Sequence, residues 1–235
     1  MDKKAIIIGA TSGIGRELAL LLRKQGWKVG VTGRRGDLLE QLRVSSPEGI
    51  YTGCFDVTDI DDLDEHLRQL AGQLGGLDLF VVSAGTGQLN PELDPAPELA
   101  TVDTNVRAFT ALCDWAYAWF RKNGGGSLTA ITSVAGLIGE AEAPAYSASK
   151  AYQIMYLESL RMAAKKRNPG RSVLEIRPGS VDTRMMQGEG HFWISTAEEA
   201  ARQAYEAINR KKTLSYISAR WSLIGLLLRL RSIFR

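Results

Sequence analysis

Residues 5–24 read AIIIGATSGIGRELALLLRK and contain three segments of different character. The β-branched run 5–8 predicts a buried strand, and the leucine-rich part from Glu17 to Lys24 predicts a helix. Between them, the glycine-rich segment 9–15 allows a tight turn and a close approach of the main chain to a ligand. A helix N-terminus attracts phosphate, so the three segments together predict a nucleotide site, with a plain turn as the alternative.

The alternation of strand and helix continues along the chain. Apolar runs predict further strands at 28–33, 50–55, 77–82, before Ser133, at 172–176 and at 214–218. Helices are expected at 99–121, around Tyr146 and at 197–210, and a loop at 86–97. Almost wholly apolar strands are typical of a parallel sheet covered on both faces. We therefore expect one α/β domain over residues 1–218, followed by a C-terminal tail, 219–235.

The composition favours a globular protein of a reducing compartment. The chain has 235 residues, 45% of them apolar, and its net charge of +3 is spread without a basic run that alternates with aromatic residues, which argues against nucleic-acid binding. Cys54 and Cys113 lie far apart in apolar segments, so we expect two buried thiols and a cytoplasmic protein. Only four apolar residues, 5–8, stand between the charged N-terminus and Gly9, and this run is too short for the apolar centre of a signal peptide. The two histidines and two cysteines lack metal-ligand spacing, and no metal site is expected.

Two arginines follow the second predicted strand. Arg34 and Arg35 stand where a dinucleotide fold presents a residue to the adenosine ribose. An acidic residue there would bind the ribose hydroxyls of NAD, whereas arginine can pair with the 2′-phosphate of NADP. We therefore expect NADP(H) in preference to NAD(H). Two solvated surface arginines are the alternative.

Acidic residues follow the third predicted strand. Asp56 comes directly after it, and Asp59, Asp61 and Asp62 are expected in the first turn of the next helix. Ordinary helix capping explains these positions. Contact between Asp56 and the adenine amino group is an equally open interpretation.

Tyr146 and Lys150 stand four residues apart in AYSASK, residues 145–150. On a helix this spacing places a phenol and an ammonium group on one face. A nearby cation lowers the pKa of a tyrosine, so Tyr146 is a candidate acid or base for an alcohol/carbonyl couple. Ser133 follows a buried strand and presents a hydroxyl. By itself the Tyr/Lys pair also fits an exposed helix face.

Two segments near the C-terminus stand apart. Residues 185–194 mix glycine with Met, Phe and Trp, and suit a lid over a pocket; His191 there is a substrate contact or an accident of sequence. Residues 221–235 are apolar around most of a helical wheel, but they are too short and too basic to span a membrane. Docking on the protein or on a partner subunit, and contact with a membrane surface, are the two interpretations.

Taken together, the motifs give the chain a specific resemblance. In this order and spacing, the sequence resembles the classical short-chain dehydrogenase/reductase family over residues 5–218. The residues that carry the resemblance are Gly9-Ala10-Thr11-Ser12-Gly13-Ile14-Gly15, Asp56-Val57, Ala84-Gly85, Asn105, Ser133, Tyr146, Lys150, Pro178-Gly179 and Thr183. The resemblance implies a Rossmann-type, doubly wound parallel sheet of about seven strands, with the site at the carboxyl ends of the strands.

The resemblance also implies roles for individual side chains. Tyr146 would transfer the proton, Ser133 would bond the substrate oxygen, and Lys150 would lower the tyrosine pKa and hold the nicotinamide ribose. Asn105 would keep an ordered water that links Lys150 to solvent. Together with the sequence arguments above, the residues expected to bind the cofactor are Gly9, Thr11, Ser12, Gly13, Ile14, Gly15, Arg34, Arg35, Asp56, Val57, Ala84, Gly85, Tyr146, Lys150, Pro178, Gly179, Val181 and Thr183.

One position departs from the family pattern, because Ser83 stands where Asn is usual before Ala-Gly. Its shorter hydroxyl is expected to bond the neighbouring backbone. The expected function is an NADP(H)-dependent oxidoreductase that interconverts a carbonyl and an alcohol. Its expected substrate is an apolar or lipid-like small molecule, and its expected assembly is a homodimer or homotetramer. A non-catalytic NADP(H)-binding redox sensor or scaffold is the alternative.

Overall fold

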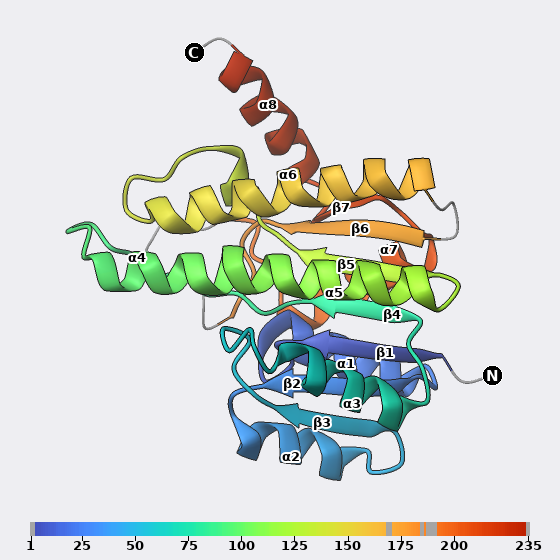
Figure 1. The fold of residues 1–235 in the computed structure, drawn as a ribbon. Helices are drawn as coiled ribbons and strands as arrows, with labels where there is room; N and C mark the ends of the chain where they lie inside the picture. Colours follow the sequence, from blue (N-terminus) through green and yellow to red (C-terminus); the bar gives the residue numbers. More distant parts are fainter. Residues whose placement is uncertain (1–2, 168–170, 184–185, 187–191, 234–235) are drawn as a thin grey trace.

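Seven strands pair in parallel to form one sheet in the computed structural model, which describes residues 3–167, 171–183, 186 and 192–233 (Figure 1). The order across the sheet is β3-β2-β1-β4-β5-β6-β7. In chain order the strands are β1 (Lys4–Ile8), β2 (Lys28–Gly33), β3 (Ile50–Cys54), β4 (Leu79–Val82), β5 (Gly126–Ile131), β6 (Arg171–Pro178) and β7 (Leu214–Ile217). The expected doubly wound α/β fold is confirmed.

Helices cover both faces of this sheet (Figure 1). Those of one face are α1 (Gly13–Lys24), α2 (Gly36–Ser45) and α7 (Ala197–Asn209). Those of the other face are α3 (Leu63–Leu74), α5 (Phe109–Lys122) and α6 (Pro144–Arg167). Within β1, Ala5 and Ile7 join the first core, and Ile6 and Ile8 join the second, because successive side chains of a strand point to opposite faces. An apolar strand buried on both sides explains the run of isoleucines.

The chain reverses its direction of travel across the sheet between β3 and β4. From β1 it proceeds outward to β3, and it then returns to place β4 on the other side of β1. In open parallel sheets, ligands bind at the carboxyl edge beside such a switch point. The loops that follow β1 and β4 therefore border the expected cleft.

The predicted helix 99–121 is longer than expected and is interrupted. It begins as α4 (Pro95–Val102), passes through the π-helical segment η1 (Asp103–Ala108) and continues as α5. The loop expected for 86–97 therefore ends earlier, because the Asp94 carboxylate accepts a hydrogen bond from the Ala96 N–H, and proline suits the first helical turn.

Two smaller expectations are wrong. Asp59, Asp61 and Asp62 precede α3, whose first turn carries Asp64 and Glu65 instead. Cys113 is buried, but Cys54 is exposed, because it is the last residue of the outermost strand β3.

The C-terminal helix α8 (Trp221–Ile233) extends away from the rest of the molecule (Figure 1). Its first residue, Trp221, is buried against Phe192 and Trp193. Leu223, Leu226 and Leu227, by contrast, are 60%, 56% and 53% exposed. Within residues 221–227, Trp221 and Gly225 are the buried positions, so the protein's own fold covers one side of this part of the helix. In the described ranges, no helix has the length and hydropathy needed to cross a membrane.

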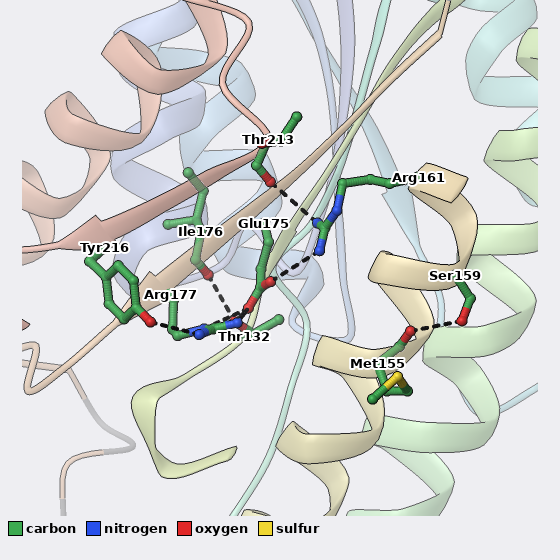
Figure 2. Close-up of polar contacts among 9 residues, drawn as sticks. All are labelled: Thr132, Met155, Ser159, Arg161, Glu175, Ile176, Arg177, Thr213 and Tyr216. Carbon is green, nitrogen blue, oxygen red and sulfur yellow. Dashed lines mark hydrogen bonds and ion pairs between the residues drawn. The ribbon is translucent and has the colours of Figure 1, made fainter. Parts of the chain in front are cut away.

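A buried ion pair within β6 lies at the centre of a polar network (Figure 2). Glu175 and Arg177 of β6 are both fully buried, and Glu175 Oε1 lies 2.7 Å from Arg177 Nη2. The same carboxylate oxygen accepts a hydrogen bond from the Thr132 hydroxyl at 2.9 Å, and Arg177 donates to the Tyr216 hydroxyl at 2.7 Å. Arg161 approaches the other carboxylate oxygen at 3.7 Å. The network ties β6 to β7, to α6 and to the residue before Ser133.

Replacement of Glu175 by alanine is expected to destabilise the fold by about 3–5 kcal/mol, because it leaves the Arg177 guanidinium buried without its counter-charge. Denaturant unfolding followed by circular dichroism would measure this loss. Glu40→Ala is the control, because Glu40 forms an exposed pair with Arg43, and its effect should be much smaller. Equal effects of the two substitutions would contradict a dominant role for the buried pair.

Candidate active site

The glycine loop follows β1 and leads into α1. Gly9 has a φ of +84°, and a Cβ on it would lie 2.6 Å from the backbone nitrogen of Ala84, so the two loops pack main chain against main chain. Ser12 is the N-cap residue of α1, but its side chain does not cap the helix. The first N–H groups of a helix have no acceptors within it, so this end remains suited to an anion.

The two predicted cofactor-selecting arginines lie beside this loop. The Arg35 guanidinium donates to the Thr11 hydroxyl at 2.6 Å and to the Ser12 hydroxyl at 3.0 Å. Arg34 is more exposed and pairs with Asp56 at 3.2 Å. Asp56 also accepts hydrogen bonds from the backbone and side chain of Thr58. Burial opposes ionisation of Asp56, but these bonds outweigh it and lower its pKa, so a carboxylate and two guanidinium groups border the ends of β2 and β3.

The segment after β4 approaches the predicted catalytic residues. A Cβ on Gly85 would lie 3.4 Å from Asn105 Oδ1 and 3.5 Å from Lys150 Nζ. A Cβ on Gly87 would lie within 2.3 Å of the Tyr146 ring, so only glycine allows this close approach. Val57, after β3, is buried below the same edge.

Asn105 uses its side chain to hold this loop. Its amide oxygen accepts from the Thr86 N–H at 2.9 Å, and its amide nitrogen donates to the Thr86 carbonyl at 2.6 Å and to the Ser149 hydroxyl at 3.0 Å. Ser83, by contrast, places its hydroxyl beside Gly15, and its side chain makes no hydrogen bond to the backbone of the described chain. The expected bond from Ser83 to neighbouring backbone is therefore absent there, and Asn105 fixes the loop instead.

Ser133 and Tyr146 are brought together from β5 and α6. Ser133 follows β5, and its hydroxyl accepts from the Ala135 N–H at 3.1 Å at the start of η2 (Val134–Leu137). It also interacts with the Tyr146 hydroxyl, whose pKa it lowers. Residues 13 positions apart in the chain thus present two hydroxyl groups to one point at the carboxyl edge of the sheet.

Lys150 lies on the same face of α6 as Tyr146, and its Nζ atom is 5.7 Å from the centroid of the tyrosine ring. The side chain is 4% exposed. Its ammonium group donates to the Ile131 carbonyl at 3.3 Å and to the Gln153 side chain at 3.0 Å. Burial disfavours the charged form and lowers the pKa of Lys150 to about 8.

The pKa of Tyr146 differs from the expectation. Burial raises it, the hydrogen bond with Ser133 opposes this effect, and the charge of Glu140 adds to it. Lys150 does not lower it in this structure, since its ammonium group bonds Ile131 and Gln153 and not the phenol. Tyr146 is consequently protonated at neutral pH, the form that can donate a proton.

The remaining predicted cofactor residues follow β6. Gly179 donates its N–H to the Ile217 carbonyl at 2.8 Å and lies against Trp221. Val181 is buried and forms an isolated bridge with Ser195, whereas the Thr183 side chain contacts the glycine loop at Gly13. Met185 and His191 of the expected lid lie outside the described residues.

Sequence reasoning missed three contributors to this arrangement: Thr86, Gly87 and Gln153. Thr86 acts through its main chain, which leaves no mark in the sequence. Gly87 is one glycine among 24, and only the Tyr146 ring reveals its purpose. Gln153 could have been found, because it stands three positions after Lys150 and shares its helix face.

The arrangement fits a dinucleotide. The N-terminus of α1 follows the glycine loop and has no side-chain cap, and two guanidinium groups lie beside it; both features suit anionic phosphates. A buried ammonium group and two hydroxyls form the other part of the site, which suits a group that carries a hydroxyl or a carbonyl.

Comparison with known sequences agrees with the fold. The family model described as short chain dehydrogenase matches residues 3–192. An uncharacterized oxidoreductase of Myxococcus xanthus is 36% identical over 191 residues, which cover 78% of this chain and 74% of that protein. An uncharacterized oxidoreductase of Staphylococcus aureus is 30% identical over 185 residues, which cover 77% and 79% of the two chains.

Solved structures share the fold at lower identity. A short-chain dehydrogenase from Streptomyces avermitilis aligns with a TM-score of 0.86 at 24% identity, over 99% of this chain and 94% of that one. ElxO with NADP bound aligns with a TM-score of 0.81 at 23% identity, over 92% and 97%. A 3-ketoacyl-(acyl-carrier-protein) reductase from Brucella melitensis, complexed with NADH, gives 0.81 at 19% identity, over 91% and 95%.

Proposed function

Because the chain belongs to the short-chain dehydrogenase/reductase family, we propose that it transfers hydride between NADP(H) and a carbonyl or alcohol substrate. The observation that carries the proposal is the meeting of Ser133, Tyr146 and Lys150 at the carboxyl edge of the sheet. Single residues of these types are common. Two interacting hydroxyls beside a buried ammonium group form a set suited to proton transfer to an oxygen.

In the proposed reaction, Tyr146 is the acid. Its raised pKa keeps the phenol protonated near neutral pH, so it can donate its proton to a substrate oxygen that gains negative charge. The bound dinucleotide supplies the hydride in this direction and accepts it in the reverse one. Reduction of a ketone or aldehyde is therefore the direction that we propose.

Ser133 and Lys150 assist Tyr146 in this proposal. The Ser133 hydroxyl, which interacts with the phenol, orients the substrate oxygen toward the same proton. Lys150, with a pKa of about 8, is mostly charged at neutral pH and can donate a hydrogen bond to a hydroxyl of the nicotinamide ribose. Asn105 keeps the loop that carries Gly85 and Gly87 against these groups.

NADP(H) is the proposed cofactor in preference to NAD(H). Arg35 lies on the hydroxyls of the glycine loop and Arg34 lies at the end of β2, where both can pair with a 2′-phosphate. Among the structural neighbours, ElxO holds NADP and the Brucella melitensis reductase holds NADH, so the preference depends on these arginines.

An apolar or lipid-like substrate is proposed from the side chains near β6. Phe192, Trp193 and Ile194 are 49%, 40% and 50% exposed, and the two aromatic rings pack on Trp221, which lies against Gly179. Exposed aromatic surface beside a cleft suits an apolar ligand.

Replacement of Tyr146 by phenylalanine should reduce ketone reduction by about 100-fold or more, because it removes the proton donor and little volume. The measurement is the rate of NADPH oxidation with a panel of ketones and aldehydes, together with NADPH binding by fluorescence, which should persist. Tyr156→Phe is the matched control on α6, since its hydroxyl bonds Asp114 and not Ser133. Undiminished turnover in Tyr146→Phe would remove the proposed acid. NADPH binding by the unchanged protein without turnover of any carbonyl would favour a redox sensor or scaffold.

Neutralisation of both Arg34 and Arg35 with alanine should weaken NADPH binding by about 10- to 100-fold, which corresponds to the loss of hydrogen bonds to a charged group. NADH binding should change much less, because NADH has no 2′-phosphate. Arg43→Ala is the control, since Arg43 is an exposed arginine of α2 that pairs with Glu40. Fluorescence titration of both cofactors decides the point, and equal losses for NADPH and NADH would exclude the proposed preference.

For the C-terminal tail, residues 219–235, we propose contact with an anionic membrane surface. The protein would then be a cytoplasmic protein that associates peripherally with a membrane. Leu223, Leu226 and Leu227 are exposed on a helix that extends from the body, and the tail contains four arginines and no acidic residue. The expectation of an evenly spread net charge is thus wrong for this segment. Apolar side chains next to basic ones are typical of helices that lie in a membrane interface.

Self-association is proposed as well. Leu99 of α4 and Met155 and Met162 of α6 are 62%, 63% and 58% exposed on neighbouring helices (Figure 1). This surface is separate from the tail and supports a homo-oligomer.

The triple change Leu223→Ser, Leu226→Ser and Leu227→Ser should abolish most binding to vesicles that contain an anionic phospholipid, because it removes the exposed apolar face of α8. Co-sedimentation with anionic and neutral vesicles provides the measurement, and Val44→Ser is the control for general loss of surface hydrophobicity, because Val44 of α2 is 64% exposed and lies outside both proposed surfaces. Unaltered sedimentation, combined with a change of oligomeric mass in light scattering, would instead identify α8 as a subunit contact.

A further inference from the structure

Gln153 is a buried polar residue that the proposed mechanism has not used. It lies on α6 three positions after Lys150, and its exposed fraction is 0%. Residues three apart share a helix face, so Gln153 points to the same interior as Lys150.

The oxygen and the nitrogen of the Gln153 side-chain amide each form a hydrogen bond with a residue of the candidate site. Its oxygen accepts from the Lys150 ammonium group at 3.0 Å, and its nitrogen donates to the Asn105 main-chain carbonyl at 2.9 Å. The orientation of the amide is fixed by chemistry, because an ammonium group only donates and a carbonyl only accepts. Gln153 therefore forms a directed bridge from α6 to Asn105.

The carbonyl that Gln153 reaches lies in the π-helical segment η1. A π-helical turn interrupts the regular i to i+4 hydrogen bonding of the helix and recurs at functional sites. Here the interruption lies where Asn105 turns its side chain to Thr86 and offers its carbonyl to Gln153. The loop after β4 and Lys150 are thus connected through one residue.

A glutamine at a fully buried position is costly unless both polar ends find partners. An apolar side chain of similar volume would fill the space without this requirement. The two partners of Gln153 are a residue with a proposed catalytic role and the main chain of another, so its polarity serves these two groups and not general packing.

The Lys150 ammonium group has three N–H donors. Gln153 and the Ile131 carbonyl take two of them. No further acceptor bonds this group in the part of the chain that the structure describes, which leaves one donor for the cleft. Two fixed bonds on the buried side therefore determine which way the third donor points.

We propose that Gln153 is a positioning residue that holds the Lys150 ammonium group on its buried side and supports its charge, an inference that rests on the proposed function. An amide does not titrate near neutral pH, so the bridge to Asn105 orients Lys150 without changing its own charge. Gln153 directly links Lys150 and Asn105, the two residues between which the family resemblance implies an ordered water.

The charged and titratable groups around Lys150 are few. Tyr146 is the titratable side chain in contact with it, and Glu140 acts on that tyrosine. Desolvation is the cause of the lowered pKa of Lys150, with no carboxylate to compensate for it. The carbonyl oxygens of Gln153 and Ile131 are accordingly what supports the ammonium charge.

Substitution of methionine for Gln153 tests the proposal, because it keeps the volume and removes both polar ends. The alkaline limb of the pH dependence of NADPH binding, measured by fluorescence without substrate, should move to lower pH by about one unit, since the ammonium loses an acceptor. The alkaline limb of kcat/KM should move in the same direction.

Gln153→Glu provides a change of opposite sign. A carboxylate beside Lys150 favours the ammonium form, so the alkaline limb should move to higher pH. Leu157→Met is the control, because Leu157 is fully buried on the same helix and its change disturbs packing without removing a polar group. It should lower the melting temperature and leave both pH profiles in place.

The outcomes separate this inference from the proposed function. If the unchanged protein binds NADPH but reduces no carbonyl, the proposed function fails, and the binding profiles still decide the role of Gln153. If the folded Gln153→Met and Gln153→Glu variants both keep the alkaline limb of the unchanged protein, Gln153 only fills space and the inference is wrong.

Discussion

Hydrogen bonding between β1 and β4 holds the two halves of the sheet together. The pairing runs from Ala5 with Leu79 to Ile8 with Val82, in parallel, so both strands end at the same edge. The glycine loop leaves one strand and the segment with Ala84 leaves the other, and the two loops meet in main-chain contact at Gly9. Every group of the proposed site belongs to this edge or to a helix that packs beside it. Without this pairing, no strand contact would hold the glycine loop next to the half of the sheet that carries Tyr146.

At the end of β5, on the carboxyl edge of the sheet, main-chain and side-chain groups contact the buried charged residues Lys150 and Glu175. Three consecutive residues there make three different contacts: the Ile131 carbonyl accepts from Lys150, the Thr132 hydroxyl donates to Glu175, and Ser133 bonds Tyr146. Buried polar groups of this kind are stable only when each has a partner. The network of Glu175 therefore holds the residue before Ser133 in place, which suits a hydroxyl that is pre-organised for the proposed catalysis.

The opposite ends of the cleft are built differently. On the side proposed for adenosine, Arg34 and Arg35 hold partners that they can exchange, namely a partly buried carboxylate and two hydroxyls. On the substrate side, aromatic rings gather around Trp221 where α8 leaves the body. The hydrogen-bonded polar groups around Lys150 thus lie between two surfaces that are proposed to determine cofactor and substrate specificity. We expect family members to differ mainly at those two surfaces.

The sequence alone determined the alternation of strands and helices, because β-branched runs, glycine turns and helical periodicity are local signals. It also predicted that Tyr146 and Lys150 share a helix face, since residues four apart lie one turn apart, but only the structure showed that this face is buried. The interruption at Asn105 and the bridge from Gln153 were decided by tertiary structure, because both depend on groups about 45 positions apart. The direction of the Tyr146 pKa shift was decided there too, since burial is its first cause and depends on how distant segments pack around the ring.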